Sequence, residues 1–401
     1  MSEPRTVAVV GAGLAGGKTV EALRAEGYDG RIILFGDELH RPYERPALSK
    51  GYLQGNDARG SVFVHPEGWY TEHDVDLRLG VEVTGLDRHA HELMTHDGEP
   101  VRYDRLVLAT GATPRRLRLP GADLPGVHYL RTLDDSDALR AVFRPGTNVV
   151  VVGAGWIGLE TAAAARGAGA TVTVLESAEL PLLRVLGPRM AQVFAGLHRE
   201  NGVDLRLGVT VSAVRGGPSA VTGVELGDGS VVAADAVVVG VGVSPNVDLA
   251  RSAGLDVDNG VLVDASLRSS DPRIFAVGDV ANAQHPVLGR RIRVEHWANA
   301  LHQPEVVAKS VLGRDAVYDR LPYFFTDQYD LGMEYVGYAD ADDEVVVRGD
   351  LDAREFVALW VRDGRVVAGM NVNVWDVTDR IRDIILAGQS ADAFELPAPS
   401  A

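Results

Sequence analysis

The stretch from Val149 to Glu176, VVVVGAGWIGLETAAAARGAGATVTVLE, predicts a strand, a tight turn, a helix and a second strand in direct succession. Four consecutive valines are typical of a strand buried on both faces of a parallel sheet. Gly153 suits the turn, Gly155 lets the backbone approach a pyrophosphate, and Gly158 lets the helix lie against the strand. Glu176 ends the second strand, where a carboxylate accepts hydrogen bonds from both hydroxyls of an adenosine ribose. The stretch therefore predicts a dinucleotide site, at which this carboxylate would repel a 2′-phosphate.

The same pattern opens the chain. A buried strand at Thr6–Val10 is followed by Gly11-Ala-Gly13-Leu-Ala-Gly16 and a helix that runs to about Glu26. The next strand, 31–35, ends in Gly36-Asp37-Glu38, so the ribose acid is displaced by one or two residues, and we predict Asp37 for this role. One G-x-G-x-x-G alone is weak evidence, but here the strand, turn and helix come in the required order twice. The chain therefore contains two dinucleotide-binding domains.

The order of these patterns indicates that one domain is inserted into the other. Hairpin signals at Asp97-Gly98 and Asp228-Gly229 each lead to an apolar strand, at 105–109 and 236–239. The second pattern is complete by about Gly242, so the strand at 274–277, which ends in Gly278-Asp279 before an expected helix, must complete the first domain. From about residue 321 the chain turns to aromatic-rich strands, with a final helix at about 376–386. We expect an α/β fold with two Rossmann-like domains and a C-terminal α+β domain.

Composition excludes several classes of function. The 401 residues include no cysteine, which removes disulfides, a redox dithiol, a sulfenate, and cysteine-held zinc or iron–sulfur sites from this chain. Neither HExxH nor a paired-histidine spacing is present, so we expect no metal. A formal net charge of -17 argues against nucleic acid and anionic membranes as partners. No apolar run reaches the length of a membrane span and no signal-peptide core opens the sequence, so we expect a cytoplasmic protein.

Several motifs together resemble one family of flavoproteins. These are VAVVGAGLAG at 7–16, RPYERPALSKGYL at 41–53, LVLATGATPR at 106–115, VVVGAGWIGLE at 150–160, IFAVGDVA at 274–281, VEHWANALHQ at 294–303 and PYFFTDQYD at 322–330. The chain is similar over nearly its whole length to the oxygenase-coupled ferredoxin reductases, within the glutathione-reductase-like flavoproteins. The resemblance implies an FAD-binding domain at 1–112 and 243–320, an NADH-binding domain at 113–242 and a C-terminal domain at 321–401.

The resemblance also implies roles for particular residues. Lys50 matches the lysine that approaches flavin N5, where an ammonium stabilises negative charge on the reduced ring. Glu160 matches the glutamate that pairs with this lysine and contacts the nicotinamide carboxamide, and Trp297 matches an aromatic residue beside the flavin. Asp279 would bind the ribityl or pyrophosphate part of FAD. The structural alternatives are a surface lysine, a first-turn glutamate that favours the helix dipole, a core tryptophan and an N-cap aspartate.

With Lys50, Glu160 and Trp297 as predicted catalytic residues, we assign further residues to cofactor binding. For FAD they are Gly11, Gly13, Leu14, Ala15, Asp37, Arg45, Lys50, Val83, Ala109, Thr110, Gly111, Arg131, Gly278, Asp279, His296 and Trp297. For NADH they are Gly153, Gly155, Trp156, Ile157, Gly158, Glu160, Glu176, Arg184 and Gly242. His296 could donate a proton, although a hydrogen-bonded, partly buried histidine is the commoner case. Phe325 replaces a tryptophan that is frequent in the family, which puts electron transfer through that position in doubt.

The resemblance implies an NADH-dependent reductase that passes a hydride to FAD and then single electrons to a 2Fe–2S ferredoxin serving an oxygenase. Two alternatives remain at this point: a stand-alone NADH oxidase or quinone or monodehydroascorbate reductase, and a flavoprotein that senses NADH without rapid turnover. The absence of cysteine excludes disulfide reductases and cysteine-dependent peroxidases. Because such ferredoxins are acidic, the arginines at 290, 291, 293, 314 and 320 are a hypothetical docking patch. The sequence leaves the oligomeric state open.

Overall fold

The structure, a computed structural model, describes residues 4–98 and 100–396. Its contacts divide the chain into two compact units. The first unit comprises Met1–Arg45, Arg59–Thr113 and Ser244–Pro322, and the second comprises Pro46–Ala58, Pro114–Val243 and Tyr323–Ala401. The segment between Arg45 and Arg59 thus belongs to the second unit although the chain on both sides of it belongs to the first. The division into three domains by function stays a prediction.

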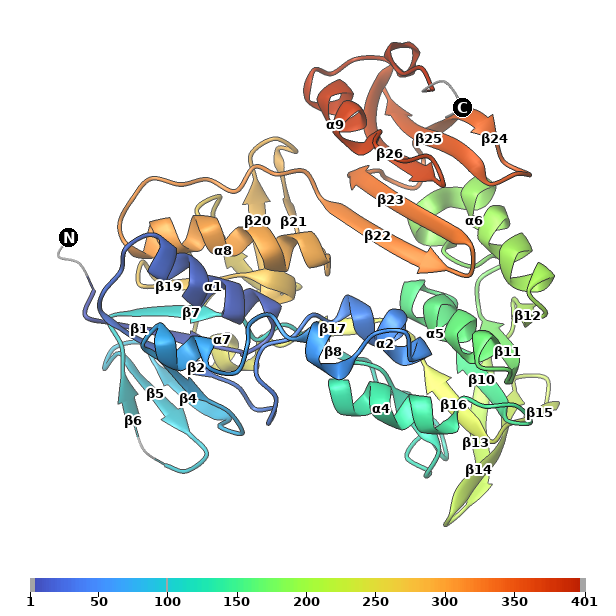
Figure 1. The fold of residues 1–401 in the computed structure, drawn as a ribbon, viewed down its shortest axis with the longest axis horizontal. Helices are drawn as coiled ribbons and strands as arrows, with labels where there is room; N and C mark the ends of the chain where they lie inside the picture. Colours follow the sequence, from blue (N-terminus) through green and yellow to red (C-terminus); the bar gives the residue numbers. More distant parts are fainter. Residues whose placement is uncertain (1–3, 99, 397–401) are drawn as a thin grey trace. The chain divides into compact units, whose positions relative to one another are not determined.

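A five-stranded parallel sheet forms the centre of the first unit, in the order β19-β7-β1-β2-β3. The strands are β1 (Thr6–Val10), β2 (Arg31–Phe35), β3 (Val75–Arg78), β7 (Arg105–Leu108) and β19 (Ile274–Ala276). Helices α1 (Leu14–Ala25) and α8 (Trp297–Val311) lie side by side (Figure 1). The apolar strand residues are almost fully buried in the resulting core, as continuous hydrophobic runs in parallel sheets require.

Two small sheets and short helices complete the first unit. Strands β4 (Val83–Asp87), β5 (Glu92–Thr95) and β6 (Pro100–Arg102) form an antiparallel sheet, and β18 (Val261–Val263), β20 (Ala281–His285) and β21 (Arg290–Ile292) form another small sheet. The short helices are η2 (Arg59–Val62), α3 (Trp69–Glu72), α7 (Asp248–Ser252) and η3 (Gly278–Val280). Strand β8 (Ala112–Pro114) pairs with β17 (Val243–Pro245).

The second unit repeats the parallel sheet, in the order β12-β11-β10-β16-β9. Its strands are β9 (Val127–Tyr129), β10 (Asn148–Val152), β11 (Thr171–Glu176), β12 (Asp204–Leu207) and β16 (Ala236–Val239). In both units the strand before the glycine turn is central, with the strand after the helix on one side and the strand after the hairpin on the other. The equivalent arrangement of these three strands confirms that the two sequence patterns specify the same Rossmann-like fold.

Helices and an antiparallel sheet surround the second parallel sheet. The helices are η1 (Pro46–Ser49), α2 (Gly51–Gln54), α4 (Leu133–Val142), α5 (Trp156–Gly167) and α6 (Leu183–Glu200). The additional sheet contains β13 (Val211–Gly217), β14 (Ala220–Leu226) and β15 (Val231–Ala233). Helix α6 is kinked at Gly187, where φ is 73° and a proline follows, so the helical geometry is interrupted.

The C-terminal part of the second unit is a five-stranded antiparallel sheet in the order β22-β23-β26-β25-β24. The strands are β22 (Tyr323–Gln328), β23 (Leu331–Gly337), β24 (Glu344–Asp350), β25 (Glu355–Arg362) and β26 (Arg365–Val372). Helix α9 (Thr378–Leu386) packs on β26 and β23 (Figure 1), and η4 (Ala391–Ala393) follows it. Two Rossmann-like folds and a C-terminal α+β sheet confirm the predicted fold class.

One local prediction was wrong. We expected a helix to begin after Asp279, but the structure has only the 3-10 turn η3 and then strand β20. The reason is pairing: residues 281–283 form a parallel ladder with β18, and residues 283–285 form an antiparallel ladder with β21. The alanines of this segment are buried in these ladders instead of along a helix face. Asp279 therefore lies in a single tight turn.

Candidate cofactor and hydride-transfer site

The first glycine of each motif is required because the chain that leaves a neighbouring strand, β7 or β16, passes close to it. Gly11 has φ 112° and Gly153 has φ 99°, a region that favours glycine. A Cβ at Gly11 would lie 2.2 Å from the carbonyl oxygen of Ala109, and one at Gly153 would lie 2.5 Å from that of Gly240. The two contacts are equivalent, because Ala109 and Gly240 each follow the strand that flanks the central one. The turns are therefore the same in both units.

The second glycine of each motif faces open space. A Cβ at Gly155 would have no atom within 4 Å, and one at Gly13 would meet only the Arg45 guanidinium, at 4.0 Å. Both glycines are helix N-caps, neither α1 nor α5 is capped by a side chain, and neither has an acid in its first turn. The first N–H groups of each helix are thus left without a side-chain acceptor. Uncapped helix N-termini with room for a close approach fit the pyrophosphates of two dinucleotides.

The ends of the second strands differ between the two units. In the second unit Glu176 ends β11, and its carboxylate accepts hydrogen bonds from the main-chain N–H of Ala154 (2.7 Å) and of Ala178 (2.8 Å). The carboxylate is therefore fixed beside the glycine turn, where a ribose would lie. In the first unit the equivalent position is Gly36, as the paired strand registers show. The exposed Asp37 follows it.

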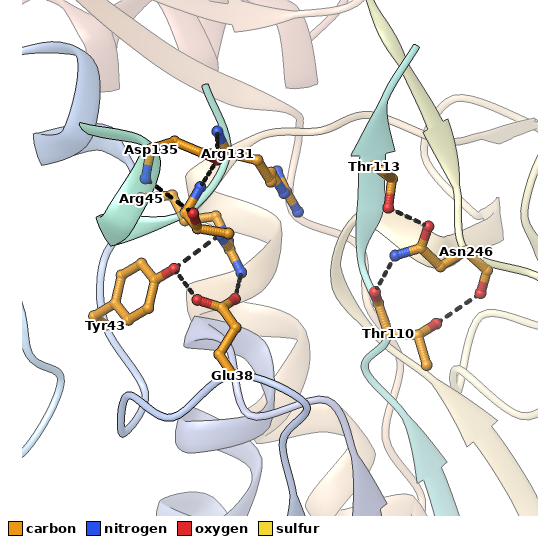
Figure 2. Close-up of polar contacts among 9 residues, drawn as sticks. Glu38, Tyr43, Arg45, Thr110, Thr113, Arg131, Asp135 and Asn246 are labelled. Atoms are coloured by element: carbon orange, nitrogen blue, oxygen red, sulfur yellow. Dashed lines mark hydrogen bonds and ion pairs between the residues drawn. The ribbon is translucent and has the colours of Figure 1, made fainter. Parts of the chain in front are cut away.

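Glu38, next to Asp37, is committed to a different contact. Its carboxylate accepts from the Tyr43 hydroxyl (2.5 Å) and from the Arg45 guanidinium (2.9 Å), while Arg45 also donates to Tyr43 (3.1 Å). Figure 2 shows Glu38 between these two side chains. Burial alone would lower the pKa of Arg45, but Tyr43 and Glu38 raise it above its ordinary value. Glu38 thus holds Arg45 beside Gly13, and the exposed Asp37 stays the predicted ribose ligand.

The turn that contains Gly278 and Asp279 is held from helix α8. The side-chain oxygen of Gln303, which is 2% exposed, accepts a hydrogen bond of 2.7 Å from the N–H of Gly278. The Gly278 φ of 72° turns the chain sharply. Sequence reasoning missed Gln303, although it closes the quoted motif VEHWANALHQ. A buried glutamine at the end of a motif that follows a Gly-Asp turn was the available signal.

Helix α8 begins with two other predicted residues. The Trp297 indole N–H donates to the Glu44 carboxylate at 3.1 Å. His296 is the N-cap residue, and burial lowers its pKa to about 4. The imidazole is therefore neutral near pH 7, which does not favour a role as a proton donor.

The chain after strand β7 is tied to residue 246, which sequence reasoning also missed. Asn246 donates through its side chain to the Thr110 carbonyl and accepts from the Thr113 hydroxyl, each at 2.8 Å, while the Thr110 hydroxyl donates to the Asn246 carbonyl at 2.8 Å (Figure 2). The Asn246 N–H donates to the Gly111 carbonyl. These bonds fix the predicted residues Thr110 and Gly111, next to the glycine turn of the first unit.

The predicted catalytic pair of the second unit is formed. The Lys50 ammonium lies 2.7 Å from Oε1 of Glu160, and the two side chains are only 14% and 3% exposed. Ser49 donates its hydroxyl to Oε2 of Glu160, and Thr326 donates to Oε1 at 2.5 Å. Lys50 also lies 5.3 Å from the centre of the Phe325 ring. Glu160 lies beyond the first turn of α5 and the Lys50 side chain is largely shielded from solvent, so the first-turn and surface alternatives do not fit, while the catalytic roles stay predictions.

The other predicted residues of the second unit are placed as follows. Trp156 packs its ring edge-on against Phe194 and Phe324. Ile157 is 43% exposed, and Arg184 is exposed in the first turn of α6. Gly242 has φ 96°. The N–H of Arg131 donates to Asp135, at the start of α4 (Figure 2).

In the first unit, the remaining predicted residues lie near the motif or the core. Leu14 and Ala15 begin α1 and are buried, as is Ala109. Val83 begins β4 and packs on the core of the first unit. None of these contacts tests ligand binding, so the site residues stay predictions.

The hypothetical arginine patch is largely neutralised in the structure. Arg293 pairs with Glu295, Arg314 with Glu26, and Arg320 with Glu305. Arg291 donates to main-chain carbonyls of Val263 and Asn282. Three of the five arginines, Arg293, Arg314 and Arg320, are therefore paired with carboxylates, and a docking role for Arg290 and Arg291 stays a prediction.

The described residues, 4–98 and 100–396, offer neither a metal site nor a membrane-spanning helix. Within them no group of three or more histidine, aspartate or glutamate side chains could hold a metal ion. No helix among them is long and apolar enough to cross a bilayer.

The uncapped helix N-terminus at the glycine turn of each Rossmann-like sheet suits a protein that holds two dinucleotides. Residues 5–303 match the pyridine nucleotide-disulphide oxidoreductase family, and 323–401 match the reductase C-terminal family. The chain belongs to the pyridine nucleotide-disulphide oxidoreductases, and its cofactors are FAD and NAD(H). Disulfide chemistry is absent from this chain, because it has no cysteine.

Individual relatives are similar over nearly the whole chain. One is the ferredoxin–NAD(+) reductase component of the anthranilate 1,2-dioxygenase system of Burkholderia cepacia, 42% identical over 98% of this chain and 97% of that protein. Another is rhodocoxin reductase of Rhodococcus erythropolis, 39% identical over 92% of this chain and 86% of that protein. The crystal structure of the covalent putidaredoxin reductase–putidaredoxin complex matches with a TM-score of 0.93 and 36% identity, covering 96% of this chain and 94% of that one.

Proposed function

We propose that the protein is an NADH-dependent ferredoxin reductase of an oxygenase system. It takes a hydride from NADH and delivers single electrons to a 2Fe–2S ferredoxin that serves a monooxygenase or dioxygenase. The relatives named above are reductases of this kind, at about 40% identity over nearly their full lengths. The NADH used as reductant is a cytoplasmic metabolite, and a cytoplasmic location is part of this proposal.

The observation that carries the proposal is the Lys50–Glu160 pair in a chain without cysteine. A buried ion pair is expensive unless other hydrogen bonds satisfy it, and here two hydroxyls also donate to the carboxylate. When bound, FAD accepts two electrons with the hydride and releases them singly. Without a cysteine to accept electrons inside the chain, they must leave to an external acceptor.

The residues have separate roles in this proposal. The turn at Gly11 and Gly13, Asp37, Arg45 and the Gly278-Asp279 turn would hold FAD. Arg45 is a fixed cation beside Gly13 and suits a phosphate there.

In the second unit, the turn at Gly153 and Gly155 would hold NADH with Glu176 on its ribose. We infer that Lys50 stabilises the negative charge of the reduced flavin. Glu160 keeps Lys50 in place and contacts the nicotinamide carboxamide.

Steady-state cytochrome c reduction by NADH tests the proposal, with and without an added 2Fe–2S ferredoxin. We expect the rate to depend strongly on ferredoxin, because cytochrome c then receives electrons through it. Fast turnover with oxygen or a quinone alone would instead support the oxidase or quinone-reductase alternative. If the NADH-reduced protein is long-lived and passes its electrons to none of these acceptors, the sensing alternative is supported.

A further inference from the structure

A chain of buried polar side chains leads away from the Lys50–Glu160 pair into the C-terminal sheet. The hydroxyl of Thr326, on strand β22, donates to Glu160 at 2.5 Å and accepts from the Gln328 side-chain amide at 3.2 Å. The amide oxygen of Gln328 lies 2.9 Å from Nε2 of His198 on helix α6. Glu160, Thr326, Gln328 and His198 are 3%, 1%, 0% and 0% exposed. We call these four residues the Glu160 network.

The hydrogen bonds of the Glu160 network run in one direction. Because Thr326 accepts from the Gln328 amide, its single hydroxyl proton is free to point at the Glu160 carboxylate, which only accepts. The Gln328 oxygen in turn requires a proton on Nε2 of His198. Burial lowers the pKa of His198, so the imidazole is neutral and its Nδ1 is the acceptor side, 3.4 Å from the Tyr329 hydroxyl. Each link therefore fixes the orientation of the next one toward Glu160.

Packing alone does not account for these residues. Burying a hydroxyl, an amide and an imidazole costs free energy that only complete hydrogen bonding offsets, and apolar side chains of similar shape would fill the same volume without this cost. Two successive residues of β22 also contact the two members of the ion pair, since Phe325 lies at Lys50 and Thr326 bonds Glu160. The first strand of the C-terminal sheet is thus part of the surroundings of the pair.

We propose that Thr326 is a positioning residue for hydride transfer: its hydroxyl fixes the Glu160 carboxylate, and through it the Lys50 ammonium, while Gln328 and His198 orient that hydroxyl. The C-terminal sheet then contributes to the chemistry of the NADH-binding domain as well as to its stability. The role rests on the proposed function for the use of Lys50 and Glu160. It concerns the reduction of FAD by NADH and not the delivery of electrons to ferredoxin.

The test compares Thr326→Val with Thr326→Ser in FAD-loaded protein by anaerobic stopped-flow reduction with NADH. Valine keeps the shape but removes the donor, so we expect the limiting rate of flavin reduction to fall roughly tenfold to hundredfold, with the NADH Kd within about twofold of wild type. Serine restores the donor and should restore the rate. The matched control is Thr378→Val. Thr378 begins helix α9, and its hydroxyl donates to Glu334 on strand β23 of the same C-terminal sheet, so its loss should leave the rate unchanged.

A double-mutant cycle supplies a second readout that needs no FAD. Because Gln328 acts through Thr326, Gln328→Leu and Thr326→Val should be non-additive, both in the limiting rate and in the urea-unfolding free energy of FAD-free protein. Gln328→Leu alone also tests the idea if Thr326→Val does not fold. A wild-type reduction rate in Thr326→Val, equal losses in the valine and serine variants, or additive effects would overturn the proposal.

The reductive half-reaction involves no ferredoxin, so the outcomes can be separated. Normal reduction in every variant would refute the positioning role and leave the ferredoxin reductase proposal standing. A wild type that is reduced by NADH but passes no electrons to ferredoxin would refute the proposed function, while the comparison of variants would still decide the role of Thr326.

Discussion

The second and third glycines of the NADH-site motif, Gly155 and Gly158, are required for different reasons. Gly155 is extended, with φ -78° and ψ -177°, and has open space where its Cβ would lie, whereas a Cβ at Gly158 would lie 2.0 Å from the Gly153 carbonyl oxygen. The conformation of Gly155 is therefore available to alanine, and we predict that a ligand uses the open space beside it. Gly158 is required by the helix–strand contact itself.

Alanine substitutions separate these two functions. Gly155→Ala should leave the unfolding free energy within about 0.5 kcal/mol of wild type and raise the KM for NADH at least roughly tenfold, because the methyl group occupies the approach of the pyrophosphate. Gly158→Ala is the contrasting variant and should lower the unfolding free energy by about 1–3 kcal/mol through overpacking. Urea unfolding and steady-state kinetics check both. An unchanged KM in Gly155→Ala would contradict the assignment of the NADH site.

At the scale of single residues, the sequence predicted the positions of the site residues well and their side-chain contacts poorly. The spacing around Gly153 fixes Glu176 at the end of its strand, and the structure confirms that position. In the first unit, the choice between Asp37 and Glu38 could not follow from spacing, because it depends on residues 39–45 folding back so that Tyr43 and Arg45 reach Glu38. The burial of Lys50 was likewise implied only by resemblance, since its partner lies 110 positions away in the sequence.

At the scale of elements, helix α8 is coupled to the turn that would bind FAD. Its Gln303 accepts from Gly278, whose N–H is otherwise buried by the turn. The sequence indicated a helix after Asp279 because alanine and valine follow the Gly-Asp turn. Residues 281–285 form β20 because they pair with β18 and β21. Local periodicity cannot predict this pairing, since both partner strands are short and lie elsewhere in the chain.

A substitution in α8 tests this coupling. Gln303→Leu leaves the Gly278 N–H without its acceptor, so we expect a loss of about 1–3 kcal/mol in unfolding free energy together with weaker FAD binding. Ser310→Ala is the control on the same helix, because Ser310 is 2% exposed and its hydroxyl has no hydrogen-bond partner among the described residues. That variant should be neutral. Full FAD retention and wild-type stability in Gln303→Leu would show that α8 does not hold the turn.

At the scale of the whole molecule, a net charge of -17 opposes an acidic partner. The sequence alone offered five arginines to overcome it, but ion pairs with Glu295, Glu26 and Glu305 occupy three of them. Arg314 and Glu26 are far apart in the chain, so no spacing rule reveals their pairing. The duplicated fold, in contrast, was predictable, because each copy contains its full strand–turn–helix pattern locally.

The hypothesis of a docking patch is tested at Arg290 and Arg291. Reversing both charges, with Arg290→Glu and Arg291→Glu, should raise the KM for ferredoxin several-fold at low salt and less at high salt, and should leave the reduction of FAD by NADH unchanged. Arg314→Ala is the control, since its charge is already balanced by Glu26. Equal losses in both half-reactions would exclude a docking role.

The central claim is that a hydride enters from NADH and leaves as single electrons to a 2Fe–2S ferredoxin. The most direct measurement is anaerobic mixing of the NADH-reduced protein with excess oxidised ferredoxin, while the absorbance of both centres is followed. Because a hydride carries two electrons and each 2Fe–2S centre accepts one, we predict two ferredoxins reduced per FAD, at a rate no slower than steady-state turnover. A reduced flavin that persists in the presence of ferredoxin, yet is reoxidised rapidly by oxygen or a quinone, would contradict the claim.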